Sequence, residues 1–179
     1  MLFRSKKGFA TLIRAMALAG GHAPALTVIG DGPLLGELRA LAGALGVGHR
    51  VRFAGWLGRA EVAAELARAD ALIAPSETAA DGDIEGMPVV IMEAMATGLA
   101  ILGTRHSGIP EIVRDGINGL TVAERDADGL AQAMSRLADP ATRARFGRAS
   151  REIAVQELSH ATLMRRLVAL LLDNGRIDR

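Results

Sequence analysis

The sequence predicts an α/β protein in which helices cover both faces of a parallel sheet. Short aliphatic runs alternate along the chain with longer segments whose apolar residues recur at helical spacing. Strands are expected near residues 26–30, 51–54, 71–74, 100–103 and 119–122. Strands that alternate with helices are typical of a parallel sheet, because parallel strands need long crossover connections. The 179 residues, 50% of them hydrophobic, are enough for one domain with an ordinary core.

Each expected strand is bounded by a recognisable signal. The run "ALTVIG" ends at the turn sequence "DGP", and "LLGELRALAGALG" after it has leucines at helical spacing. The run "RVRFAG" precedes the helical segment "RAEVAAELARAD", and "ALIAPS" precedes a long loop and a helix whose first residue is predicted to be Pro88. The runs "LAILGT" and "NGLTV" supply the last two strands, and Asp126 is the predicted N-cap of the helix "DADGLAQAMSRLAD".

Both ends of the chain carry helical patterns. At the start, "FATLIRAMALAG" has only "MLF" ahead of it to form a first strand, so the chain is expected to be cut there. At the end, residues 141–179 are expected to form helices that pack alongside the sheet, with an apolar stripe through Leu163, Leu167 and Leu170. Residues 1–179 are therefore expected to be a single domain, without an internal repeat or a linker.

Composition excludes several classes of function. The chain has 21 basic and 20 acidic residues and no long basic block, so binding to nucleic acid is not expected. The absence of cysteine excludes disulfides and thiolate metal sites, and no cluster with metal-ligand spacing is visible, so no metal is expected. No apolar stretch has the length of a signal peptide core or of a membrane span, and a soluble, cytoplasmic protein is expected.

The longest connection between a strand and a helix, residues 75–87, is the expected ligand site. In open parallel sheets, ligands bind at the carboxyl ends of the strands, in the loops that lead into helices. The free amides at the start of the next helix favour an anion such as a diphosphate, and Gly86 would let a ligand approach the backbone closely. Glu93 lies inside that helix, and an ionised carboxylate can accept hydrogen bonds from both hydroxyls of a ribose.

The stretch "EGMPVVIMEAMATG" resembles the E-x7-E signature of the retaining glycosyltransferases of the GT-B fold, in family 4, the glycosyl transferases group 1. The segments "KKGFATLIRAM", "VIGDGP", "VRFAGWL", "ADALIAPS" and "GTRHSGIPEIVRDGINGLTV" are similar, in order, to successive segments of that family's C-terminal, donor-binding domain. The stretches "SETAADGDIEG" and "TRHSGIPE" resemble, more narrowly, bacterial exopolysaccharide glycosyltransferases, which implies a role in polysaccharide biosynthesis. The resemblance implies a Rossmann-like sheet, the C-terminal half of a GT-B fold.

The resemblance further implies transfer of a hexose from a UDP- or GDP-sugar, with retention of configuration and without a cofactor or a metal. Glu85 would position the transferred sugar rather than attack it, and Glu93 would hold the ribose. Lys7 matches the family lysine that neutralises charge on the leaving phosphate, a form of electrostatic catalysis. Lys7 is expected across a cleft from the two glutamates. In a front-face mechanism, the departing phosphate would itself assist the acceptor hydroxyl.

The other donor-binding positions that the resemblance implies act through their backbone. They are Gly86, Met87, Val89, Val90 and Leu57. Gly86 and Met87 would line the sugar pocket, and the backbone amides of Val89 and Val90 would bind the diphosphate. The base of the nucleotide would lie near Leu57.

Three conspicuous side chains are assigned structural roles. Trp56 is expected in the core or at the edge of a pocket, rather than as a platform for a sugar. His106 precedes "SGIPEI", in which Glu111 suits the first turn of a helix, so both are expected to support the fold.

The chain departs from the family pattern in two ways. The family arginine that grips the diphosphate aligns with Leu2, and Arg4 is out of register. The N-terminal half of a GT-B enzyme, which carries the acceptor site, is absent from the 179 residues. The chain is therefore expected to be a fragment that binds nucleotide weakly and transfers no sugar, and any peripheral membrane association would come through the missing half.

Three other functions stay open at this point. The chain could be a catalytically inactive sugar-nucleotide-binding or interaction module, or it could belong to a sugar-nucleotide epimerase of the GT-B fold. An oxidoreductase-type dinucleotide domain is the third, but "VIGDGP" lacks the G-x-G-x-x-G pattern. Calorimetry with UDP-sugars, GDP-sugars and NAD would separate these functions.

Overall fold

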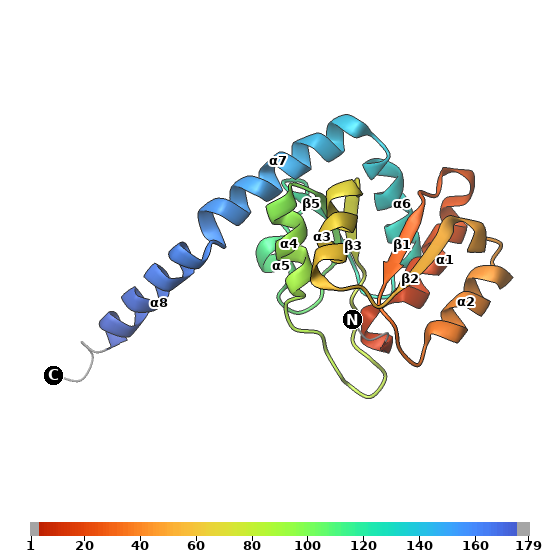
Figure 1. Ribbon diagram of the computed structural model, residues 1–179, viewed down its shortest axis with the longest axis horizontal. Coiled ribbons are helices and arrows are strands. Elements are labelled where there is room, and N and C mark those ends of the chain that lie inside the picture. Colours follow the sequence, from red (N-terminus) through yellow and green to blue (C-terminus); the bar gives the residue numbers. More distant parts are fainter. Residues whose placement is uncertain (1–3, 175–179) are drawn as a thin grey trace.

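The computed structural model describes residues 4–174 (Figure 1). The strands are β1 (Leu26–Ile29), β2 (Val51–Gly55), β3 (Ala71–Ala74), β4 (Ala100–Thr104) and β5 (Gly119–Val122). The helices are α1 (Phe9–Ala19), α2 (Leu35–Ala44), α3 (Arg59–Arg68), α4 (Val89–Thr97), α5 (Ile109–Ile112), α6 (Ala127–Leu137), α7 (Pro140–Glu157) and α8 (His160–Asn174). Short 3-10 turns are η1 (Ser5–Lys7), η2 (Gly20–His22) and η3 (Gly48–Arg50). The predicted strand positions are confirmed to within one residue at each end.

The strands pair in parallel, but in two sheets rather than the single sheet that was expected. β1 pairs with β2, and β3, β4 and β5 follow one another in that order, with Leu102 opposite both Ile73 and Leu120. No strand pairing joins the two sheets within residues 4–174. Both sheets nevertheless share one core, because Val28 of β1 and Leu102 of β4 belong to the same buried cluster. Hydrophobic periodicity locates strands, but it does not say which strands pair.

β4 is buried on both faces and shows how the helices are layered. Ala100 and Leu102 belong to the buried cluster formed with α1, α2 and α6, whereas Ile101 belongs to the cluster formed with α3, α4, α5 and α7. Alternate residues of a strand face opposite sides of its sheet, so helices cover both faces, as a parallel sheet requires. The predicted α/β class is therefore confirmed.

Two predicted helix starts had different outcomes. Asp126 is the N-cap of α6, as predicted, and its Oδ1 accepts a hydrogen bond from the backbone N–H of Gly129 over 2.7 Å. Pro88 is not the first residue of α4, because its ψ of 116° is extended and places it at the N-cap, with Val89 first in the helix. The proline ring fixes φ at a value that suits both conformations, and it leaves ψ to the tertiary structure.

The last two helices behave differently. α7 packs against α4 and β4, whereas α8 projects away from the body of the molecule (Figure 1). Leu163, Leu167 and Leu170 are 40%, 46% and 62% exposed, so the expectation that the helices of 141–179 all pack beside the sheet is wrong for α8. The apolar stripe marks the face that could be buried, but within residues 4–174 nothing covers it. Residues 175–179 lie outside the described residues.

α7 crosses the end of α4 so closely that Gly147 has no room for a side chain. A Cβ there would lie 2.2 Å from the carbonyl oxygen of Gly98. We therefore expect Gly147→Ala to lower the free energy of unfolding by about 1–3 kcal/mol, although alanine favours helices. Urea denaturation followed by circular dichroism measures this change. The matched control is Gly43→Ala in α2, where a Cβ meets nothing within 4 Å and a gain of about 0.5–1 kcal/mol is expected. Equal responses of the two variants would contradict the close approach.

Candidate active site

The loops that follow β3, β4 and β5 converge at one edge of the sheet. Parallel strands present their carboxyl ends on the same side, so the loops after them are neighbours. One residue from each loop meets the others there: His106, after β4, lies between Glu85, after β3, and Glu124, after β5. The turn η1 joins the same edge, because the backbone N–H of Glu77 donates to the carbonyl of Lys6 over 2.9 Å.

Lys7 and Glu85 form an ion pair at this edge. Lys7 Nζ lies 2.7 Å from Glu85 Oε2, and the two side chains are only 15% and 18% exposed, so solvent screens the pair less than a surface pair. Lys6 Nζ lies 4.0 Å from the same oxygen, and it donates to Asp83 Oδ1 over 3.0 Å and to the carbonyl of Ile84 over 3.1 Å. Lys7, expected across a cleft, thus contacts Glu85 directly.

Glu85 Oε2 keeps free capacity to accept a hydrogen bond. The atom is removed from water, and no described residue donates a hydrogen bond to it. Its short contact with Lys7 is an ion pair, which compensates its charge. A buried acceptor without a donor is unfavourable, and a ligand hydroxyl would relieve it.

Gly8 explains how Lys7 reaches this position. Its φ of +64° is left-handed, which favours glycine, and it allows the chain to turn from η1 directly into α1. A Cβ at Gly8 would lie 1.7 Å from the carbonyl oxygen of Pro75, so only glycine lets η1 lie against the loop after β3. The sequence pair of lysine and glycine therefore fixes the lysine beside the loop that carries Glu85.

His106 and Glu124 form a second polar pair behind Glu85. The His106 side chain is 2% exposed, and its Nδ1 lies 2.6 Å from Glu124 Oε1. The other oxygen of Glu124 accepts a hydrogen bond from the backbone N–H of Thr78 over 2.7 Å. Burial alone would raise the pKa of Glu124, but the hydrogen bonds from Thr78 and His106 outweigh burial and hold the pKa below its usual value. Glu124 is therefore a carboxylate near neutral pH.

Glu93 lies in α4, and Glu85 lies in the loop before it, as predicted. Glu93 is exposed, and it shares a helix face with Val89, which stands four residues earlier and is 62% exposed. No described residue accepts a hydrogen bond from the backbone N–H of Val89 or Val90 at the start of α4. Because the helix dipole adds partial positive charge there, this end of α4 suits an anion.

The structure does not bring every predicted residue into contact. Leu57 is half-buried between β2 and α3, and neither Leu57 nor Glu93 forms a hydrogen bond or an ion pair with Lys7 or Glu85 in the described part of the chain. Gly86 is exposed, and Met87 is half-buried and packs on the core cluster of α4 and α5.

Two sequence interpretations concern residues beside the site. Trp56 is 71% exposed, so of the two places expected for it, the core and the edge of a pocket, the core is wrong. It follows Gly55, whose φ of +72° ends β2 and turns the chain out of the packed layer. Leu2, which aligns with the family arginine, lies outside the described residues.

Sequence reasoning missed four residues that shape this edge. They are Lys6, Thr78, Asp83 and Glu124. Glu124 had a usable signal, because it follows a predicted strand at its carboxyl end, where the site was expected. Lys6 and Asp83 had no such signal, since a salt bridge between residues 77 positions apart is set by the fold alone.

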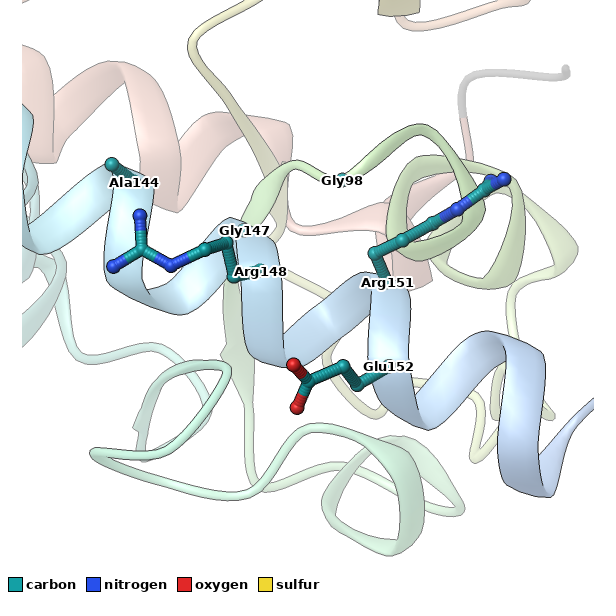
Figure 2. Close-up of a pocket in the computed structure, with 6 residues that line it drawn as sticks. All are labelled: Gly98, Ala144, Gly147, Arg148, Arg151 and Glu152. Atoms are coloured by element: carbon teal, nitrogen blue, oxygen red, sulfur yellow. The ribbon is translucent and has the colours of Figure 1, made fainter.

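Two surface hollows lie away from this edge. The larger, of about 470 Å³, lies where α7 crosses the end of α4 (Figure 2), and it is lined by Gly98, Ala144, Gly147, Arg148, Arg151 and Glu152. Arg151 already donates a hydrogen bond to the carbonyl of Ala96 at the end of α4. The smaller, of about 240 Å³, lies between α1 and α2. Neither hollow contains Lys7, Glu85 or Glu93, so we place the candidate site at the carboxyl edge of the sheet, where charged groups and free amides converge.

The fold matches that of HepE from Anabaena, solved in complex with UDP and, in another crystal, with UDP-glucose. The match to the UDP complex has a TM-score of 0.83 and 25% identity, and it covers 97% of this chain and 47% of HepE. The fold is thus that of the GT-B glycosyltransferases, and the predicted Rossmann-like α/β fold of their C-terminal half is confirmed. The family described as Glycosyl transferases group 1 matches residues 2–153, and the chain belongs to this family.

Two relatives illustrate the range of the family. The amylovoran biosynthesis glycosyltransferase AmsK of Erwinia amylovora is 38% identical over 134 residues, which cover 74% of this chain and 33% of AmsK. The GDP-mannose-dependent alpha-(1-6)-phosphatidylinositol monomannoside mannosyltransferase of Mycolicibacterium smegmatis is 36% identical over 170 residues, which cover 93% of this chain and 44% of that enzyme. The chain therefore spans less than half the length of these relatives.

Two further features of the described residues bear on partners. None of their helices combines the length and the apolar character needed to cross a membrane. They contain no group of three or more histidine, cysteine or acidic side chains arranged to hold a metal ion. That the reaction needs no metal stays a prediction.

Proposed function

We propose that this chain is the donor-binding half of a retaining glycosyltransferase that transfers a hexose from a nucleoside diphosphate sugar. The observation that carries the proposal is the pair of Lys7 and Glu85, in which Glu85 Oε2 is removed from water and accepts no hydrogen bond from the described residues. A sugar hydroxyl would supply that hydrogen bond, and a phosphate would give Lys7 a second anionic partner. Membership of the glycosyltransferase family and the ligands of HepE support the proposal.

In this proposal each charged residue has a distinct task. Lys7 neutralises the charge that grows on the leaving phosphate, Glu85 orients the hydroxyls of the transferred sugar, and Glu93 accepts hydrogen bonds from the ribose. The departing phosphate takes the proton of the acceptor hydroxyl, which attacks the anomeric carbon from the same face. No cofactor and no metal take part.

Backbone groups complete the proposed donor site. The amides of Val89 and Val90 bind the diphosphate at the start of α4, and Gly86 and Met87 line the sugar pocket. The base lies near Leu57, in the loop after β2. This places the donor along the carboxyl edge of the sheet, as in other open α/β folds.

The donor is proposed to be a UDP- or GDP-sugar and the product a bacterial polysaccharide made in the cytoplasm. HepE was solved with UDP-glucose, one relative is named as GDP-mannose-dependent, and another acts in amylovoran biosynthesis. These names support the class of donor and leave the base and the sugar to be measured.

The acceptor site is proposed to lie in a second, N-terminal domain. The chain matches only 47% of HepE, and α8 exposes apolar side chains that a further domain could cover. The 179 residues alone should then bind donor weakly and transfer no sugar. An inactive binding module and a GT-B epimerase remain the alternatives, and epimerisation of a UDP-sugar by this chain would favour the latter.

The different contacts proposed for Glu85, to the sugar, and for Glu93, to the ribose, can be tested directly. We expect Glu93→Gln to weaken binding of UDP or GDP by on the order of 1.5–3 kcal/mol, because the ribose hydroxyls lose a charged acceptor. Glu85→Gln should leave nucleoside diphosphate affinity nearly unchanged and reduce only the additional affinity that the sugar provides. Isothermal titration calorimetry with UDP, UDP-glucose, GDP, GDP-mannose and NAD measures both effects.

Two outcomes of this titration would refute the proposal. One is equal loss of nucleoside diphosphate affinity in both variants, which would contradict separate contacts to ribose and sugar. The other is tighter binding of NAD than of either sugar nucleotide, which would favour a dinucleotide domain instead.

A further inference from the structure

The buried ring of His106 joins two loops that leave neighbouring strands. On one side, its Nδ1 lies 2.6 Å from Glu124 Oε1 in the loop after β5. On the other side, its Nε2 lies 3.0 Å from the backbone nitrogen of Glu85 and 3.1 Å from the carbonyl oxygen of the same residue. With the side chain only 2% exposed, water does not compete for either nitrogen.

Two of the three partner atoms of the ring favour one tautomer. The Glu124 carboxylate can only accept, so Nδ1 carries the proton of that hydrogen bond. At Nε2, the amide N–H of Glu85 can only donate and the carbonyl oxygen of the same residue can only accept; a hydrogen bond from the nearer amide requires Nε2 to present its lone pair. The imidazole with its proton on Nδ1 satisfies Glu124 and the Glu85 amide at once, and it leaves the Glu85 carbonyl without a hydrogen bond from the ring.

The peptide group between Ile84 and Glu85 is held at both of its polar atoms. Its carbonyl, on Ile84, accepts a hydrogen bond from Lys6 Nζ over 3.1 Å. Its N–H, on Glu85, donates to His106 Nε2 over 3.0 Å. Because a peptide group is planar, fixing both atoms fixes the plane and, with it, the position of Cα of Glu85, from which the side chain starts.

That position limits which groups the carboxylate of Glu85 can reach. The preceding part of the loop is tied to itself at Ala79 and Gly82, and to other elements at Glu77, Thr78 and Asp83. Those contacts place the loop before Glu85, but none of them is made by the backbone N–H of Glu85 itself. His106 ties that N–H to the sheet, because it lies two residues after β4, a strand buried along its whole length.

We propose that His106 is a positioning residue of the donor site: its Nδ1–H tautomer, set by Glu124, holds the peptide of Glu85 so that the Glu85 carboxylate faces both Lys7 and the hydroxyls of the sugar. The inference rests on the proposed function, in which Glu85 contacts the transferred sugar. His106 and Glu124 thereby contribute to sugar binding. His106 does so through the structural role that the sequence predicts for it.

Three variants test the proposal in the 179-residue chain. His106→Leu fills the space but accepts nothing, His106→Gln keeps an acceptor within reach of the Glu85 amide, and His49→Leu alters an exposed histidine of η3 as the matched control. Amide hydrogen exchange by NMR reports the Glu85 N–H directly. Calorimetry gives the extra affinity due to the sugar, as the difference between a nucleoside diphosphate and its sugar derivative. The pair used is UDP and UDP-glucose or GDP and GDP-mannose, whichever the unsubstituted chain binds.

The expected results differ between the variants. His106→Leu should lower the exchange protection of the Glu85 amide by roughly tenfold or more and reduce the sugar-dependent part of the affinity by roughly tenfold, with little change for the nucleoside diphosphate. His106→Gln should recover most of both losses, and His49→Leu should change neither. In the unsubstituted chain, imidazole ¹⁵N shifts should show the Nδ1–H tautomer of His106, and Glu124→Ala should reduce its population.

Several outcomes would overturn the proposal. Unchanged protection of the Glu85 amide in a folded His106→Leu variant is one, and lost protection with unchanged sugar-dependent affinity is another. If His106→Leu does not fold, the tautomer decides, because an Nε2–H imidazole in the unsubstituted chain contradicts the assigned hydrogen bond. A chain that binds no sugar nucleotide refutes the proposed function instead, and the tautomer and exchange measurements still decide whether His106 holds the peptide.

Discussion

Lys7→Ala is expected to lower kcat by about 10²–10³-fold in a two-domain enzyme made by joining this chain to the remaining part of a relative. The ammonium would meet charge that grows only as the bond to the leaving phosphate breaks, so its loss should affect the transition state more than the ground state. Steady-state kinetics with a UDP- or GDP-sugar gives kcat, and calorimetry on the 179-residue chain gives the ground-state affinity for the nucleoside diphosphate, which should fall less than kcat does.

The neighbouring lysine supplies the matched control for this experiment. Lys6 has the same charge and is also largely buried, but its Nζ hydrogen-bonds Asp83 and the carbonyl of Ile84. Lys6→Ala should therefore loosen the Glu85 peptide and weaken sugar binding, and it should cost less in kcat than Lys7→Ala. An unchanged kcat in Lys7→Ala, or a larger loss in Lys6→Ala, would refute the leaving-group role of Lys7.

Gly8→Ala is expected to be the most destabilising of the glycine substitutions, lowering the free energy of unfolding by about 3–5 kcal/mol. The alanine would have to adopt a φ of +64°, and its Cβ would lie 1.7 Å from the carbonyl oxygen of Pro75. Relief of that clash must move η1 away from the loop, which separates Lys7 from Glu85. Urea denaturation measures the loss in stability, and nucleotide binding to the folded fraction should weaken in parallel.

Gly46→Ala separates the two causes of this loss. Gly46 has a φ of +71°, close to that of Gly8, but a Cβ there meets nothing within 4 Å. The control should therefore show only the backbone strain, about 1–2 kcal/mol. An equal loss of unfolding free energy in both variants would mean that the clash with Pro75 contributes nothing. It would then contradict the close approach of η1 to the loop after β3.

Most of the fold was predictable because its signals are local. Each strand is a short aliphatic run with turn residues beside it, and Asp126 marks the start of α6 by a cap that needs only the next turn of the helix. The start of α4 was missed by one residue, since ψ of Pro88 depends on packing. The exposure of Trp56 and of the stripe on α8 was missed because an apolar residue does not specify what will cover it.

Part of the candidate site could also be predicted from the sequence, and part could not. The spacing of Glu85 and Glu93 places one in a loop and the other in the helix that follows, and the sequence pair of Lys7 and Gly8 places a cation beside a backbone turn. The meeting of His106 with Glu85 and Glu124 had no comparable signal. These residues lie 21 and 18 positions apart, and only the order of β3, β4 and β5 in the sheet makes their loops neighbours.

The sequence by itself determined the α/β class, the positions of the strands, the family and the residues available to the site, because periodicity, turn residues and motif spacing are properties of neighbours along the chain. The tertiary structure alone decided that the strands form two sheets, that α8 stands free of the body in the described residues, and that Lys7 touches Glu85. Those contacts depend on backbone direction and on the closeness with which glycines such as Gly8 let segments approach, which are properties of the folded chain.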